Sequence, residues 1–294
     1  MTALRRLTAA LAICVATAAV VSSAHAQDTN MRWDPGWGRF GWWDVGLTAV
    51  YTTEFVLIQT LRLPPTHGAR GTVFPDEPFR SAFRARRAAD RALAASISDV
   101  LIYSMLFHAL VVDPVAVAWL VHDVEDTAWQ MAAIDAQALM LGVMISFTLK
   151  AVAERERPLN RGCRARDAYG TGCGDYDRFR SFPSGHTVEA SVVAGLTCAH
   201  HEHLALYGGG AGDLAACGAM IGLAAVIGML RVVSDEHYAT DILAGTVIGF
   251  VAGWLMPTLL FYGFGDSRRA GTSITGVTIE ALSAPATLSL GASF

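Results

Sequence analysis

Long apolar stretches alternate with short polar loops through most of the chain. Apolar stretches of this length are typical of helices rather than strands, and loops such as HDVEDT and GGGAGD separate neighbouring stretches. The pattern predicts helices over residues 97–121, 128–156, 187–206, 214–232 and 238–262. We therefore expect an all-α helical bundle.

The same stretches bear on whether this bundle enters a membrane. The run from Ile242 to Phe264 has no charged residue and is long enough to span a bilayer, and Leu214 to Leu230 nearly is. A mean hydropathy of +0.38 lies between soluble and membrane proteins. Other stretches contain polar residues that are costly against lipid but ordinary in a soluble bundle, namely His108, Asp113, Asp135, Glu189 and residues 200–203. Segment length favours a membrane-embedded or membrane-docked bundle.

The N-terminal residues 1–26 have the features of a secretory signal peptide. Two arginines precede an apolar stretch, and the sequence AHA at its end fits a small-x-small cleavage site. An uncleaved membrane anchor is the alternative, and both interpretations direct the chain to the export machinery.

The regions on either side of the bundle differ from it in composition. Residues 27–96 are rich in aromatic residues and arginine, with an apolar segment at 47–63 that Glu54 interrupts and an expected amphipathic helix at 79–96. The bundle domain is expected at 97–265. In the tail, residues 266–294, apolar and polar positions alternate on both sides of a Ser-Ala-Pro turn, which predicts a short C-terminal β-hairpin.

The charge balance argues against a general nucleic-acid binder. The chain has 22 basic and 26 acidic residues, and residues 1–26 contain two of the basic ones, so the net charge moves from −4 to −6 without them. Nucleic-acid-binding domains are usually basic. Lys150 is the single lysine among the 22 basic residues. Lys150 is therefore a candidate functional residue, because a compact ammonium interacts with ligands differently from a planar guanidinium.

The cysteines fall into two groups. Cys163 and Cys173 flank a polar loop, which in an exported protein predicts a local disulfide, with free thiols as the alternative. Cys198 and Cys217 lie in apolar helical stretches and are expected to be small buried residues.

The first segment that carries chemistry is KAVAERERP, residues 150–158. On a helix Lys150 and Arg157 are seven residues apart and point the same way, while Pro158 pushes Arg157 out of the helical region and ends the helix there. The alternative is a surface ladder in which Glu154 pairs with both cations.

The second segment is RSFPSGHTVEA, in which a rigid turn precedes a helix. Ser184 offers a hydroxyl, Gly185 allows a ligand to approach the backbone, and His186 begins the helix. Free N–H groups and the positive end of the helix dipole bind anions readily. A plain helix cap with an incidental histidine is the alternative.

The third segment is LRVVSDEHYATDIL. His237 and Asp241 are four residues apart, so on a helix the carboxylate can hold the imidazole Nδ1–H and leave Nε2 facing outward. This arrangement suits a nucleophilic or basic histidine, and Arg231 adds a cation. An ordinary hydrogen-bonded His–Asp pair is the alternative.

The three segments are expected to meet. In an up-down bundle, the end of helix 128–156, the start of helix 187–206 and the end of helix 214–232 lie at the same rim. The gathered lysine, arginines, Ser-Gly turn and histidines suit a phosphoryl group. Cations and N–H donors would hold its oxygens, one histidine would attack, and the other would protonate the leaving oxygen.

This arrangement resembles the tripartite signature of the type 2 phosphatidic acid phosphatase and vanadium haloperoxidase superfamily. The resemblance covers about residues 97–262 and departs from the usual pattern at Leu230, where the family has Ser. The matching positions are Lys150 and Arg157-Pro158, then Pro183-Ser184-Gly185-His186, then Arg231, His237 and Asp241.

The resemblance implies a metal-free phosphatase that needs no cofactor. It implies that His237 is the nucleophile that forms a phosphohistidine, that Asp241 orients it, and that His186 is the general acid. The implied phosphate ligands are Lys150, Arg157, Arg231, Ser184 and the Gly185 N–H. A haloperoxidase that holds vanadate in the same pocket and a non-catalytic lipid-phosphate binder are the alternatives.

The run HHEH at residues 200–203 also invites a metal site. Adjacent histidines point to different helix faces, so we expect no metal there and interpret the run as a solvated helix end.

The sequence leaves the substrate and the orientation open. A rim at membrane level suggests lipid phosphates or diphosphates, and a soluble bundle suggests small phosphomonoesters. If segment 47–63 crosses the membrane after a cleaved signal, the motifs face the cytoplasm. Because Glu54 weakens that segment and the Cys163–Cys173 pair fits export, we expect the motifs to face the periplasm.

Overall fold

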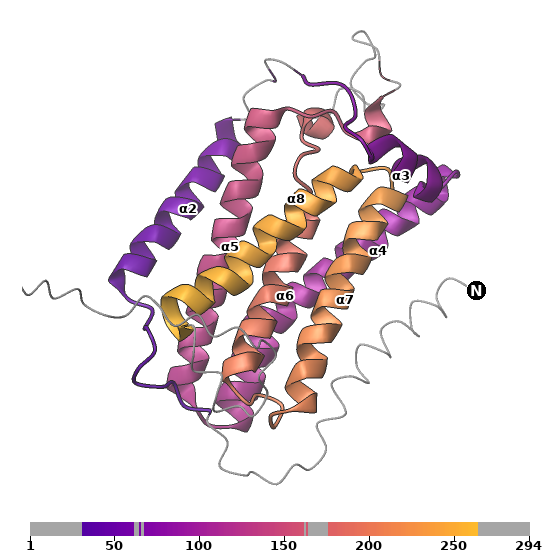
Figure 1. Ribbon diagram of the computed structural model, residues 1–294. Coiled ribbons are helices and arrows are strands. Elements are labelled where there is room, and N and C mark those ends of the chain that lie inside the picture. Colours follow the sequence, from indigo (N-terminus) through magenta and orange to yellow (C-terminus); the bar gives the residue numbers. More distant parts are fainter. Residues whose placement is uncertain (1–30, 62–64, 66–67, 162, 164–175, 264–294) are drawn as a thin grey trace, which may run out of the picture.

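The computed structural model describes residues 31–61, 65, 68–161, 163 and 176–263. Within these residues the protein is a helical bundle without a β-strand (Figure 1). The predicted all-α bundle is therefore confirmed. The predicted signal peptide at 1–26 and hairpin tail at 266–294 lie outside the described residues and stay predictions.

Six helices run along the bundle in the described part of the chain: α2 (Trp42–Leu61), α4 (Ala88–Phe107), α5 (Glu125–Ala153), α6 (Gly185–His203), α7 (Ala211–Val233) and α8 (Ala239–Phe250). π-helical turns extend two of them, namely η1 (His108–Val121) after α4, then η4 (Val251–Leu255) and η5 (Thr258–Tyr262) after α8. Shorter elements at one end are α3 (Asp76–Phe83), η2 (Pro158–Asn160) and η3 (Tyr176–Phe179).

Helix α6 is the centre of the bundle. It packs against α4, α5, α7 and α8, while α2 lies at the edge along α5 (Figure 1). Its side chains Val188, Val192 and Leu196 are buried against Ile134 of α5 and Ile227 of α7. The central helix of the bundle therefore carries the Pro-Ser-Gly-His turn at its start.

Four helices are long and apolar enough to cross a membrane: Ala88–Val121, Glu125–Ala153, Ala211–Val233 and Ala239–Tyr262. Large apolar side chains such as Leu120, Leu243 and Val247 point outward from them and are exposed. A bilayer would cover such an apolar outer surface. The expected membrane bundle is thus confirmed.

The amphipathic helix expected at 79–96 is in fact two helices. Arg84 has an extended backbone, with φ −57° and ψ 130°, and ends α3. The N–H of Ala85 then donates to the carbonyl of Val233 at the end of α7, with an N–O distance of 3.0 Å. The chain leaves the helical path to make this contact, and four residues, 84–87, separate the end of α3 at Phe83 from the start of α4 at Ala88.

Polar residues that interrupt the apolar stretches pair with one another where α6 ends. His200 Nε2 is 2.7 Å from Asp135 Oδ1, and His200 Nδ1 is 2.6 Å from the Tyr262 hydroxyl. His201 Nδ1 is 2.5 Å from Asp213 Oδ1. These histidines are buried, so the expectation of a solvated helix end at 200–203 is wrong. Buried carboxylates provide the partners that the sequence pattern did not reveal.

A disulfide joins Cys198 of α6 to Cys217 of α7. The two cysteines were expected to be separate small buried residues, and that expectation is wrong. Because the two helices pack against each other, the Cα atoms of these residues lie 4.5 Å apart, within the range that a disulfide bridges.

Three glycines let the backbone of α8 and η4 touch α6. A Cβ at Gly253 would lie 2.1 Å from the carbonyl oxygen of Val192, and one at Gly249 would lie 2.5 Å from that of Val188. Gly245, one turn earlier, faces the start of α6 in the same way. Small residues at four-residue spacing permit such close helix approach in membrane bundles.

We expect Gly253→Ala to destabilise the bundle by about 1–3 kcal/mol, because the added methyl overpacks a backbone contact. Gly222→Ala on α7 is the matched control, since nothing lies within 4 Å of its Cβ position and alanine favours a helix. Thermal unfolding of both variants in detergent checks this. Equal melting temperatures would contradict the close packing of η4 on α6.

Candidate active site

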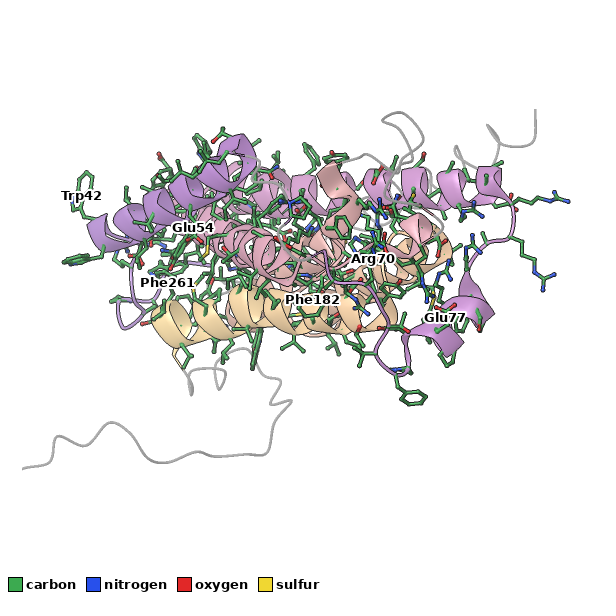
Figure 2. All side chains as sticks on the ribbon, turned by 90° about the horizontal axis from the view of Figure 1, so that it is seen from above. Trp42, Glu54, Arg70, Glu77, Phe182 and Phe261 are labelled. Atoms are coloured by element: carbon green, nitrogen blue, oxygen red, sulfur yellow. A yellow bond between two sulfur atoms is a disulfide. The ribbon has the colours of Figure 1, made fainter. Side chains whose placement is uncertain are left out.

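The three predicted segments meet at one end of the bundle. The end of α5, the start of α6, the end of α7 and the start of α8 lie there, with α3 beside them (Figure 1). Figure 2 shows Arg70 and Glu77 toward this end and Trp42 and Phe261 toward the other. Asp99 Oδ1 lies 2.7 Å from His186 Nε2 and 3.6 Å from Arg231 Nη1. Arg157 and Arg231 both contact the carboxylate of Glu236, the residue before His237. The structure therefore brings the predicted cations and both histidines together.

Lys150 reaches this site from the last turn of α5. Its side chain is buried, with 7% of its surface exposed, so it does not belong to a surface ladder. A Cβ at Gly185 would lie 2.9 Å from Lys150 Nζ. Glycine at the start of α6 thus leaves room for the ammonium beside the N–H groups of the helix, a combination that binds anions.

The path from Lys150 to Arg157 is not the predicted helix. Helix α5 ends at Ala153, and Glu154 has a left-handed backbone with φ 42°. Arg157 is extended, with φ −66° and ψ 145°. The two cations converge because the chain turns at Glu154, so their expected position on one helical face is wrong.

Arg157 and Arg231 share one carboxylate. Arg157 Nη1 forms an ion pair with Glu236 Oε2, and Arg231 Nη2 lies 3.5 Å from the same oxygen. Arg231 Nη1 also donates to Ser98 Oγ at 3.1 Å. Both guanidinium groups are largely buried, which strengthens their attraction for an anion.

His237 lies just before α8, and a carbonyl fixes its ring. Nδ1 is 2.7 Å from the carbonyl oxygen of Ser181 and therefore donates its proton there. Asp241 Oδ2 is 3.6 Å from Nδ1, too far for a hydrogen bond. The direct His237–Asp241 bond expected from the sequence is therefore wrong, although the outcome for the ring is the same: Nε2 keeps its lone pair.

Asp241 instead organises the start of α8. Its Oδ2 accepts from Ser181 Oγ at 2.6 Å and from the Tyr238 N–H at 2.9 Å. Ser181 thus contacts both residues, through its carbonyl to His237 and through its hydroxyl to Asp241. Asp241 acts on the histidine through Ser181 rather than directly.

Burial lowers the pKa of His237 well below its ordinary value of 6.5, and the neighbouring cations lower it further. The depressed pKa keeps the imidazole neutral at neutral pH. A neutral ring with an available Nε2 is the form that a nucleophile requires.

His186 lies in the first turn of α6, outside the four candidate membrane spans. Its Nε2 is 2.7 Å from Asp99 Oδ1 of α4. Burial lowers the pKa of His186 to about 4, with a further contribution from Arg231, while Asp99 acts in the opposite direction. Negative charge on a bound ligand would raise this pKa and favour the protonated form that a general acid needs.

Ser184 is a structural link at this end of the bundle. The residue is buried at the N-cap of α6, and its Oγ accepts from Thr187 Oγ1 at 2.9 Å. The Ser184 N–H donates to the carbonyl of Asp241 at 3.1 Å. These contacts tie the start of α6 to the start of α8.

Arg155 is a residue of the site that sequence reasoning missed. It forms ion pairs with Asp76 of α3 and Asp241 of α8, and both carboxylates are fully buried. Its Nη1 donates to Thr240 Oγ1 at 2.8 Å, and its guanidinium lies 4.3 Å from the centroid of the Tyr238 ring. Asp99, Ser181 and Glu236 were missed as well, because their partners come from distant segments or from backbone atoms.

The described residues contain no group of three or more His, Cys, Asp or Glu that could hold a metal ion. The predicted Cys163–Cys173 disulfide involves Cys173, which lies outside the described residues, so that pairing stays a prediction.

Comparison with known proteins supports the motif assignment. A family model described as the PAP2 superfamily matches residues 133–264, a region that holds all three motifs, so the predicted resemblance is confirmed there. A transmembrane PAP2-type phosphatidylglycerolphosphate phosphatase from Bacillus subtilis is 18% identical, with a TM-score of 0.46 over 74% of this chain and 94% of that one. LpxE from Aquifex aeolicus is 22% identical, with a TM-score of 0.34 over 60% of this chain and 90% of that one. No curated protein sequence matches the chain.

Replacing Arg155 by methionine should destabilise the protein by about 3–5 kcal/mol, because it leaves two carboxylates buried without their shared cation. Arg39→Met is the matched control, since Arg39 pairs with Asp126 where both side chains are more than half exposed, and such pairs contribute little. Thermal unfolding in detergent measures both changes. Similar melting temperatures for the two variants would show that the Arg155 network is not a stabilising element.

Proposed function

We propose that the protein is a metal-free phosphatase that hydrolyses phosphate esters or diphosphates through a phosphohistidine on His237. The observation that carries this proposal is the fixed tautomer of His237. Ser181 accepts the Nδ1 proton, and the available Nε2 lies in the field of Lys150, Arg157 and Arg231. Cations around a neutral imidazole attract a phosphoryl group and stabilise the charge that develops on it.

In the first step, the lone pair of His237 Nε2 forms a bond to phosphorus. The bond from phosphorus to the ester oxygen breaks, and its electron pair stays on that oxygen, which takes a proton from His186. Lys150, Arg157, Arg231 and the N–H of Gly185 hold the other phosphoryl oxygens. The bound anion favours the protonated form of His186 before this transfer.

In the second step, water attacks the phosphohistidine. His186, now neutral, takes a proton from the water as its oxygen bonds to phosphorus. The P–N bond breaks and its electron pair returns to Nε2. Orthophosphate leaves, and both histidines regain their starting protonation states.

Lipid phosphates or lipid diphosphates are the proposed substrate class. The site lies at one end of helices that are apolar enough to cross a membrane, so a head group reaches it from the membrane surface. The membrane is therefore both the location of the enzyme and the source of its substrate.

Phosphate release by the purified full-length protein tests this proposal. A soluble phosphomonoester, phosphatidate and a polyprenyl diphosphate are offered in detergent with a chelator present. We expect release from a lipid substrate, and a loss of at least about a thousandfold in His237→Ala. His122→Ala, at the other end of the bundle, is the control variant and should retain activity.

Three outcomes would contradict parts of the proposal. Release that requires a divalent metal would exclude the metal-free mechanism. Bromide oxidation on addition of vanadate, without phosphate release, would indicate a haloperoxidase. Binding of lipid phosphate without turnover would indicate a binding protein.

The catalytic end is proposed to face the periplasm. The predicted signal peptide and the predicted Cys163–Cys173 disulfide support an oxidising compartment for this part of the chain. A cysteine introduced by Glu77→Cys, at the catalytic end, should react with a membrane-impermeant maleimide applied from the periplasm. One introduced by Asp126→Cys, at the other end, should not. The reverse pattern would place the site in the cytoplasm, as expected if α2 crosses after a cleaved signal.

A further inference from the structure

The position between the two arginines of the candidate phosphate site already holds an anion. Glu236 Oε2 contacts Arg157 Nη1 and lies 3.5 Å from Arg231 Nη2. Arg157 and Arg231 come from different segments of the chain, so this single oxygen joins them. A phosphoryl oxygen bound by both arginines would have to take the same place.

The Glu236 side chain is able to leave this position. It is 22% exposed, whereas its partner Arg231 is 7% exposed. The backbone of Glu236 is held independently, because its N–H donates to the carbonyl of Arg231 at 3.1 Å. The carboxylate can therefore rotate into solvent while the neighbouring His237 keeps its place.

Arg231 also retains a donor that Glu236 does not use. Its buried Nε has no hydrogen-bond partner among the described residues. A buried guanidinium normally uses its donors, and leaving one unpaired costs free energy. A tetrahedral oxyanion has more acceptor oxygens than a carboxylate and could satisfy this donor while it replaces Glu236.

We propose that Glu236 is a tethered competitor that occupies the oxyanion site of Arg157 and Arg231 when no ligand is bound and is displaced by the phosphoryl group. This inference rests on the proposed function. Displacement lowers the affinity for substrate and for orthophosphate by the same factor, because either ligand must first remove the same carboxylate. After hydrolysis, the return of Glu236 to the arginines promotes release of orthophosphate.

Equilibrium binding measurements distinguish two models. In one, the ligand displaces the Glu236 carboxylate; in the other, the carboxylate stays in place and repels the ligand. The probes are orthophosphate, largely a dianion at slightly alkaline pH, and dimethyl phosphate, a tetrahedral monoanion in which two of the four oxygens carry methyl groups. Isothermal titration calorimetry with the full-length protein in detergent measures both without turnover. Displacement predicts that Glu236→Gln tightens the binding of both probes by a similar factor, about fivefold or more.

Two matched variants accompany this measurement. Glu77→Gln removes a carboxylate at the same end that pairs with Arg80 and Arg161 instead, and it should leave both affinities within about twofold of the wild type. Glu236→Asp keeps the charge on a shorter side chain and should give an intermediate gain. It also tests the proposal if Glu236→Gln fails to fold.

The outcomes are distinct. A larger gain for orthophosphate than for dimethyl phosphate would show a fixed repulsive charge and overturn displacement. No gain for either probe, with binding by the wild type intact, would overturn the role of Glu236. Failure of orthophosphate to bind to the wild type and to both Glu236 variants would instead contradict the proposed function.

Discussion

The arrangement of the catalytic end depends on one buried cation, Arg155. Its guanidinium lies between Asp76 of α3 and Asp241 of α8, and neither carboxylate is in contact with solvent. Charges in such a place are tolerated when each has a close partner of opposite sign. The pairing therefore fixes three segments relative to one another. Through Asp241 and Ser181, it also determines how His237 is held.

The same requirement explains the other end of the bundle. His200 and His201 would be costly between apolar helices, as would Asp135 and Asp213, but each histidine lies beside a carboxylate. The polar residues that interrupt the apolar stretches are thus concentrated in layers where they pair. Between the two layers, α6 is surrounded by aliphatic side chains and glycine contacts. Paired charges at the ends and close apolar packing between them are compatible with a membrane bundle.

Local patterns were sufficient to predict the helices and the three motifs, because apolar stretches and residue spacings lie within short segments of sequence. Contacts between distant residues were not predictable in this way. Arg155 meets Asp76 across 79 residues, and His186 meets Asp99 across 87. The turn at Glu154 was missed because the sequence around it is a good helix former, and Pro158 suggested a later end. The Cys198–Cys217 disulfide depends on which faces of α6 and α7 meet, which helical periodicity alone leaves open.

The glycine contacts between α8 and α6 have a consequence for lateral access from the bilayer. Where the carbonyls of Val188 and Val192 touch Gly249 and Gly253, no acyl chain can pass between the two helices. The disulfide between α6 and α7 likewise prevents those helices from separating at Cys198. If the proposed lipid substrate presents its head group to His237, its tails therefore stay on the outside of the bundle at these two contacts. Differences in acyl-chain length and unsaturation would then affect contacts at the outer helical surface rather than in an internal tunnel along α6.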